Sequence, residues 1–199
     1  MTMYHDTFQG FLLFRKYKRS WSFPKEIERI IMDETSDGSV IHLYGGRAQF
    51  GTRLDMDLKS NPHVLGNALY PPFKCKSFDY AVIDPPYADL KAGIAYPIMM
   101  PAACLARKKV FWLHTHWGIR HGLGLRLNRW WLGSPASTGS PIRILAEYNV
   151  VGHPKACSGY PRQGRKRFNE MMGKYDWSKE IPNPKPYPQI VWQQKLNGV

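Results

Sequence analysis

The stretch Tyr80-Ala81-Val82-Ile83-Asp84-Pro85-Pro86-Tyr87 carries the most information in the chain. Its first half is an apolar run of strand length, and its second half places a carboxylate, two prolines and an aromatic ring after that strand. A residue before proline is restricted to extended backbone, and the prolines have no N–H to donate, so their carbonyls only accept hydrogen bonds. This grouping suits a site that holds a flat ring with an amine, such as a nucleobase. Taken alone, it also fits a strand that ends in a rigid turn.

Composition limits the class of protein. The chain has 199 residues, of which 43% are hydrophobic, so we expect a single domain over residues 1–199 that buries its own core. The net charge of +13 and the pI of about 9.8 indicate a polyanionic partner, first of all nucleic acid. No segment reaches the roughly 20 apolar residues of a membrane span, so no membrane partner is expected.

The cysteines and histidines argue against a metal centre. Cys75, Cys104 and Cys157 are odd in number and form no CxxC pair, which indicates neither a disulfide framework nor a thiolate site. With an N-terminus unlike a signal peptide, they favour reduced thiols in a cytoplasmic protein. His114, His116 and His121 are close together, but no nearby Cys or acidic residue completes a zinc site. We expect no metal, and we expect His114 to lie near the functional site.

Periodicity and turn residues predict strands that alternate with helices or loops. One helix is expected from Pro24 to about Met32, and a second, interrupted by prolines, over about 92–106. Strands are expected at 40–44, 52–56, 63–66, 80–83, 109–114, 143–151 and 189–194. The pattern favours an α/β fold with a mostly parallel, seven-stranded sheet and helices on both faces.

Glycine or polar residues follow four of these strands in succession. They are Tyr44, Gly45 and Gly46 after the first, Asp55 and Asp57 in the second, Asn67 and Ala68 after the third, and Asp84 after the fourth. The carboxyl ends of parallel strands share one edge, where open α/β sheets bind ligands, and a carboxylate after the second strand commonly binds a ribose. The glycines do not form GxGxxG or a P-loop. Sequence alone leaves Asp55 and Asp57 open, since either could also cap a helix.

This order of motifs resembles the class I S-adenosylmethionine-dependent methyltransferases. It is most similar to their DPPY-type amino-methyltransferases, which modify the exocyclic amine of adenine or cytosine, and the resemblance covers roughly residues 19–90. It implies a Rossmann-like fold and S-adenosylmethionine as the cofactor. Two departures matter: the spacing from Gly46 to Asp55 is too short for a full helix, and no separate target-recognition domain is visible.

The resemblance also implies roles for individual residues. Tyr44, Gly45 and Gly46 would border the methionine part of the cofactor, Asp55 or Asp57 would bind its ribose, and Asn67 and Ala68 would flank its adenine. The N-terminal segment 1–35 would close over the cofactor through Phe23 and Pro24. Asp84, Pro85, Pro86 and Tyr87 would be the catalytic residues that hold the target amine.

The substrate implied first is adenine-N6 in DNA. Adenine in RNA, cytosine-N4 in DNA and a catalytically silent nucleic-acid-binding subunit are the alternatives. The small size of the chain suggests loose sequence specificity or a protein partner that supplies target recognition.

Two stretches interleave basic and aromatic residues, as single-stranded nucleic-acid platforms do. They are residues 116–141 and the basic insertion or tail loop at 153–188. The candidate nucleic-acid-binding residues are Arg120, Arg126, Arg129, Arg162, Arg165, Lys166 and Arg167.

Overall fold

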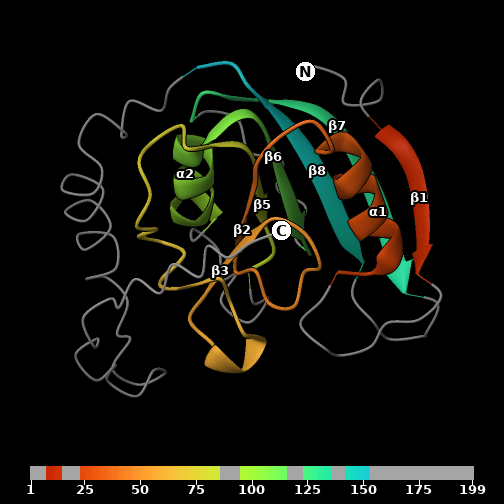
Figure 1. The fold of residues 1–199 in the computed structure, drawn as a ribbon. Helices are drawn as coiled ribbons and strands as arrows, with labels where there is room; N and C mark the ends of the chain where they lie inside the picture. Colours follow the sequence, from red (N-terminus) through yellow and green to blue (C-terminus); the bar gives the residue numbers. More distant parts are fainter. Residues whose placement is uncertain (1–7, 15–22, 86–94, 116–122, 136–141, 153–199) are drawn as a thin grey trace, which may run out of the picture.

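The computed structural model describes residues 8–14, 23–85, 95–115, 123–135 and 142–152. Within these ranges eight strands form one sheet. They are β1 (Phe8–Phe14), β2 (Val40–Leu43), β3 (Thr52–Asp55), β4 (Val64–Leu65), β5 (Phe78–Ile83), β6 (Ala106–His114), β7 (Leu125–Pro135) and β8 (Arg143–Val150). Their order across the sheet is β1-β7-β8-β6-β5-β2-β3-β4 (Figure 1).

The sheet is mostly parallel, as the sequence predicts. Every described neighbouring pair is parallel except the two that β8 makes, with β6 and with β7. The carboxyl ends of β2, β3, β4 and β5 therefore meet at one edge of the sheet. The polar residues that follow these strands are brought to that edge.

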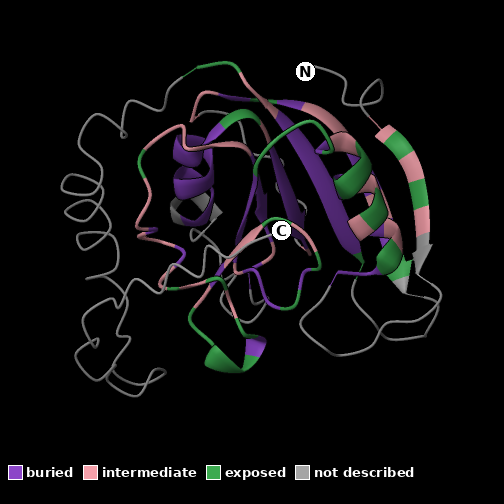
Figure 2. Ribbon diagram, in the orientation of Figure 1, coloured by how far each residue is buried: buried purple, intermediate pink, exposed green. Residues whose placement is uncertain are grey.

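Two α-helices, α1 (Lys25–Glu34) and α2 (Ala95–Leu105), lie on opposite faces of the sheet. α2 packs its Met99 into a cluster with Leu43 and Ile83, whereas α1 packs Ile27 into a cluster with Val82. Because successive strand residues point to opposite faces, neighbouring positions of one strand contact different helices. Figure 2 shows the central strands and α2 buried, while α1 keeps an exposed side. The prediction of helices on both faces is confirmed.

The connection between β2 and β3 contains no helix. Parallel neighbours usually need a crossover of a dozen or more residues, but here residues 44–51 suffice. Ala48 and Phe50 of this loop pack against the cluster that contains Ile27 and Phe23. The loop thus covers the α1 face of the sheet where a helix would otherwise lie. A 3-10 helix, η2 (Leu58–Ser60), lies between β3 and β4.

Three sequence expectations need correction. The sheet has eight described strands instead of seven, because β1 and β7 were not predicted as strands; the expected strand at 189–194 lies outside the described residues. β7 contains Arg129 beside buried tryptophans, and the buried Glu147 of β8 compensates that charge. Finally, Cys75 is a free thiol but Cys104 is disulfide-bonded, so the expectation of reduced thiols is wrong for Cys104.

No helix within the described ranges is long and apolar enough to span a membrane.

Candidate functional site

A glycine turn at the end of β2 is pressed against β3. The Gly45 N–H donates to the Leu54 carbonyl at 2.9 Å, and the Gly46 N–H donates to Oδ2 of Asp55 at 2.8 Å. A Cβ atom on Gly45 would lie 2.8 Å from Cβ of Arg53, so only glycine fits there without a shift. Tyr44 has a φ of +61°, which is an outlier for a bulky residue and is found most often at functional sites.

The structure distinguishes the two candidate ribose-binding carboxylates. Asp55 is half-buried at the end of β3, and its second oxygen, Oδ1, accepts from the Asp57 N–H at 2.9 Å. Asp57 is exposed and accepts from the Lys59 N–H at 2.9 Å, which makes it the N-cap of η2. Asp57 therefore has the helix-capping role, and Asp55 faces the glycine turn.

The end of β4 joins the same edge. The Gly66 N–H donates to the Asp55 carbonyl at 2.9 Å, which links the carboxyl ends of β3 and β4. Asn67 is half-buried, and its Oδ1 accepts from the Leu69 N–H at 2.9 Å in a local turn. Ala68 is buried in the core. Of these residues, Asn67 is the better placed to meet a ligand.

Asp84 follows β5 at the centre of the sheet. Leu43 of β2 pairs with Ile83 of β5, so Asp84 lies next to Tyr44 across the two neighbouring strand ends. Asp84 is half-buried, whereas Pro85 is buried. Pro86 and Tyr87 lie outside the described residues. The structure thus brings Asp84 to the same edge as the glycine turn and Asp55.

Three further predicted residues lie in the interior. His114 is buried at the end of β6, beside β5, with its ring stacked on Trp112 at 4.2 Å. Phe23 is buried with its ring 5.8 Å from that of His42, and Pro24 is the N-cap of α1. The position of His114 beside the Asp84 strand agrees with the sequence prediction.

The predicted nucleic-acid-binding residues are only partly described. Arg126 is exposed on β7. Arg129 is instead held inside the molecule, because its guanidinium contacts Glu34 at 2.7 Å and Glu147 at 2.5 Å. Arg120, Arg162, Arg165, Lys166 and Arg167 lie outside the described residues.

Sequence analysis missed a basic pocket of about 450 Å³ beside the glycine turn. It is lined by Arg47, Ala48, Gln49, Arg53, Lys59, Ser60, Asn61 and His63. These residues come from the β2–β3 loop, from β3 and from the β3–β4 connection. Three cations and a histidine within residues 47–63 were the available signal in the sequence. The described ranges contain no cluster of three or more His, Cys, Asp or Glu that could hold a metal ion.

Comparison with known proteins places the fold in a class. No protein-family model matches the chain, and no curated protein matches it in sequence. Solved structures do share its architecture, and they include methyltransferases. The chain therefore has a methyltransferase-type α/β fold.

Three solved structures illustrate the likeness. A provisionally described RNA methyltransferase from Pyrococcus horikoshii is 11% identical with a TM-score of 0.51, covering 74% of this chain and 95% of its own. TrmN from Thermus thermophilus is 12% identical with a TM-score of 0.50; the match covers 62% of this chain but only 48% of TrmN. A Burkholderia thailandensis 1,6-didemethyltoxoflavin-N1-methyltransferase, solved with S-adenosylhomocysteine, is 10% identical with a TM-score of 0.44 and covers 64% of this chain and 78% of its own.

Proposed function

We propose that the protein is an S-adenosylmethionine-dependent methyltransferase that acts on the exocyclic amine of a nucleobase, with adenine-N6 in DNA as the first candidate substrate. One observation carries the proposal. The glycine turn bound to Asp55 and the Asp84-Pro85 strand end lie next to each other at the carboxyl edge of a parallel sheet. This is where the fold binds ligands, and it supplies one carboxylate on each side of the central strand β2.

The residues at β2, β3 and β4 fit the cofactor. A carboxylate has about four lone-pair positions. Backbone N–H groups of Gly46 and Asp57 occupy one on each oxygen of Asp55, which leaves acceptors for the two hydroxyls of a ribose. Gly45 and Gly46 keep the backbone open to close approach by the methionine part. When bound, S-adenosylmethionine supplies an electrophilic methyl group.

Asp84 and Pro85 are suited to activating an aryl amine. The lone pair of such an amine is delocalised into the ring, which makes the nitrogen a poor nucleophile. One amine N–H would donate to the Asp84 carboxylate and the other to the Pro85 carbonyl, which favours a pyramidal nitrogen with a localised lone pair. The Asp84 carboxylate also stabilises the positive charge that develops on nitrogen, and its fixed position lowers the cost of orientation.

The amine is inaccessible inside a duplex, so the base must be flipped out or already single-stranded. The net charge of +13 supports binding to either kind of nucleic acid. Adenine in RNA is the second candidate substrate, because the Pyrococcus protein that shares the fold is described as an RNA methyltransferase. Cytosine-N4 presents a similar amine, and a silent subunit would retain the fold without turnover.

The deciding experiment supplies isotopically labelled S-adenosylmethionine together with DNA and RNA and identifies labelled nucleosides by mass spectrometry. We expect label in N6-methyladenine from DNA, and its loss by at least about a hundredfold in Asp84→Ala, since preorganised groups of this kind contribute factors of that size. Label in RNA or in methylcytosine would keep the mechanism and replace the substrate. Label that survives in Asp84→Ala would contradict the mechanism, and no label with folded protein would favour the silent subunit.

Cofactor binding tests the assignment of Asp55 separately, using Asp57→Ala as the matched control. Asp55→Ala removes the acceptor that faces the glycine turn and should weaken binding of S-adenosylmethionine about tenfold or more, since hydrogen bonds to charged groups contribute about 1.5–3 kcal/mol. Asp57→Ala removes only the cap of η2 and should leave the affinity within about threefold. Isothermal titration calorimetry measures both. Equal losses in the two variants would show that the effect is structural.

A further inference from the structure

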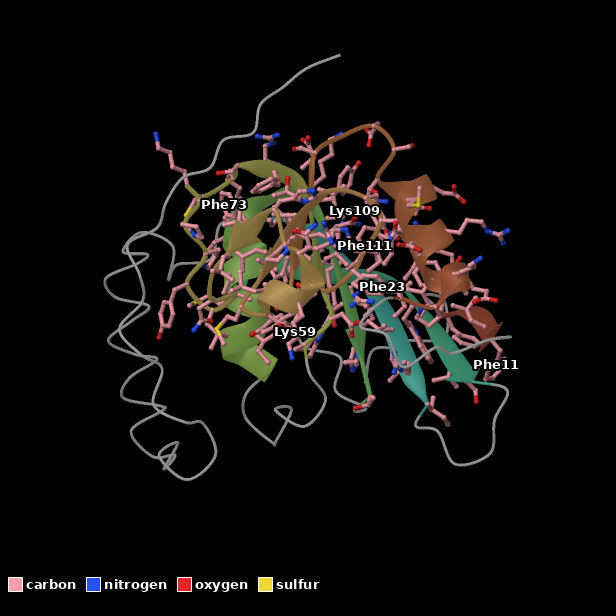
Figure 3. The ribbon with its side chains drawn as sticks, turned by 60° about the horizontal axis from the view of Figure 1, so that its bottom comes forward. Phe11, Phe23, Lys59, Phe73, Lys109 and Phe111 are labelled. Carbon is pink, nitrogen blue, oxygen red and sulfur yellow. The ribbon has the colours of Figure 1, made fainter. Side chains whose placement is uncertain are left out.

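The basic pocket beside the glycine turn has a function of its own to explain. Its cations, Arg47, Arg53 and Lys59, come from consecutive segments on one side of β3. In contrast, other cations of the described chain are neutralised: Arg107 pairs with Asp79, and Lys108 pairs with Asp37. None of the three pocket cations has a carboxylate within ion-pair distance among the described residues. Figure 3 shows Lys59 well apart from Lys109, which belongs to a different charged cluster.

Arg53 is held rigidly by its neighbours. Its Nη1 donates to the carbonyls of Gly46 at 3.3 Å and Ser60 at 3.2 Å, and its Nη2 donates to the carbonyl of Asn61 at 2.9 Å. Since a guanidinium has five N–H donors, three are used and two remain for a ligand. Carbonyls orient the side chain without cancelling its charge. The geometry is that of a preformed cation awaiting an anion.

His63 adds a neutral donor to the same pocket. Its Nδ1 accepts from the Arg53 N–H at 3.0 Å, so the proton of the neutral imidazole lies on Nε2. Burial, together with the charge of Arg53, lowers the pKa of His63 below its ordinary value. Nε2–H is therefore available as a donor at neutral pH.

The carboxylates nearest the pocket are already engaged with backbone N–H groups. Glu28 accepts from Gln49 at 3.1 Å, Asp57 accepts from Lys59, and Asp55 accepts from Gly46. They anchor the loops that form the pocket walls and are oriented toward those amides. The remaining side-chain donors of the pocket match the oxygens of a phosphate, for which arginine and lysine are the usual partners.

We propose that this pocket binds a backbone phosphate of the nucleic-acid substrate, on the opposite side of the glycine turn from Asp84. The inference rests on the proposed function and adds a contact that positions the strand. β3 lies two strand spacings from β5, about 10 Å. Stacked nucleotides advance about 3.4 Å each, so a base at Asp84 and a phosphate in the pocket are about three nucleotides apart. The pocket would therefore fix the register of the strand without reading its sequence.

The test compares two double variants that lose the same charge. Arg47→Gln/Lys59→Gln changes exposed side chains that line the pocket, and Arg29→Gln/Lys74→Gln changes exposed cations that do not line it. Binding of a fluorescent single-stranded oligonucleotide is measured over a range of salt concentrations without cofactor. The pocket variant should bind about tenfold or more weakly, and its salt dependence should fall by about 1.4 in slope, at about 0.7 per phosphate lost. The control variant should change much less.

Inorganic phosphate distinguishes the sources of the anion. It is titrated at constant ionic strength while the imidazole resonance of His63, assigned with His63→Gln, is followed by NMR. Loss of oligonucleotide binding in the pocket variant alone supports the proposal. Equal losses in both variants would overturn it, because only total charge would matter. A His63 response to phosphate with unchanged oligonucleotide binding would also overturn it in favour of a small-anion site.

Failure of this proposal is distinguishable from failure of the proposed function, because binding is measured without the cofactor. If the pocket variant loses oligonucleotide binding but the wild type transfers no methyl group, the phosphate site stands and the enzymatic proposal falls. If methyl transfer occurs and the pocket variant binds normally, only the phosphate site falls.

Discussion

His42 on β2 shows how much one residue can tell about the interior. Its side chain is fully buried between the rings of Phe23 and Phe50, and neither ring nitrogen has a hydrogen-bond partner among the described residues. Burial, with smaller contributions from the charges of Arg53 and His63, lowers the pKa of His42 to about 3. The folded protein therefore keeps this imidazole neutral at pH values where an unfolded chain protonates it.

This burial predicts acid sensitivity. Because the folded-state pKa is below the ordinary value of 6.5, the stabilising contribution of His42 is complete above pH 6.5 and is lost as the pH falls. The slope approaches about 1.4 kcal/mol per pH unit, or about 2 kcal/mol between pH 7 and pH 5. His42→Leu should remove this part of the pH dependence and raise stability at pH 5.

Urea denaturation of the wild type and of His42→Leu at both pH values measures the effect. His63→Gln is the control and should alter the pH dependence less, because His63 is more exposed. If His42→Leu retained the full pH dependence of the wild type, another group would be responsible. If it were strongly destabilised at pH 7, the imidazole would have a binding partner such as an internal water.

At the scale of elements, strands with simple hydrophobic patterns could be predicted and those with compensated charges could not. β2, β5 and β6 are apolar runs bounded by turn residues, and their predicted positions match within a few residues. β7 carries Arg126 and Arg129 among tryptophans, which suggests a surface for nucleic acid. Its burial depends on Glu147, which lies on β8 and becomes a neighbour of Arg129 only after the chain folds.

The candidate site was predictable to a similar extent, and for a related reason. Residues that follow predicted strands, such as Gly46, Asp55 and Asp84, were found because the ends of parallel strands must meet. The choice between Asp55 and Asp57 was not possible, since it depends on which carboxylate reaches the glycine turn. The basic pocket was missed because Arg53 belongs to a strand and its role emerges only through loop carbonyls.

At the scale of the whole molecule, one ion network ties α1 to the outer half of the sheet. Glu34 at the end of α1 and Glu147 on β8 share the cations Lys109 of β6 and Arg129 of β7, with contacts between 2.5 and 3.1 Å. Burial alone would lower the pKa of Lys109, but its hydrogen bonds to both carboxylates outweigh that and raise it. Two positive and two negative charges balance, so the interior retains no net charge at this point.

The side chain of Glu147 is fully buried, and its removal should therefore be costly. Glu147→Gln would leave Lys109 and Arg129 short of one carboxylate in a region with little access to water. We expect a loss of about 3 kcal/mol in the free energy of unfolding. Glu34→Gln should cost only about 1 kcal/mol, because the side chain of Glu34 is 29% exposed and water screens its charge.

Urea denaturation followed by tryptophan fluorescence measures both losses, because Trp130 and Trp131 lie beside Arg129 on β7. In the double variant the losses should not add, since the two carboxylates share the same cations. The hydrogen bond from Arg129 outweighs burial and lowers the pKa of Glu34, so its contribution is present above pH 4.5 and is lost as the pH falls. Glu34→Gln should therefore be less sensitive to acid than the wild type. Additive losses, or a Glu147→Gln variant as stable as the wild type, would mean that the network does not hold α1 against the sheet.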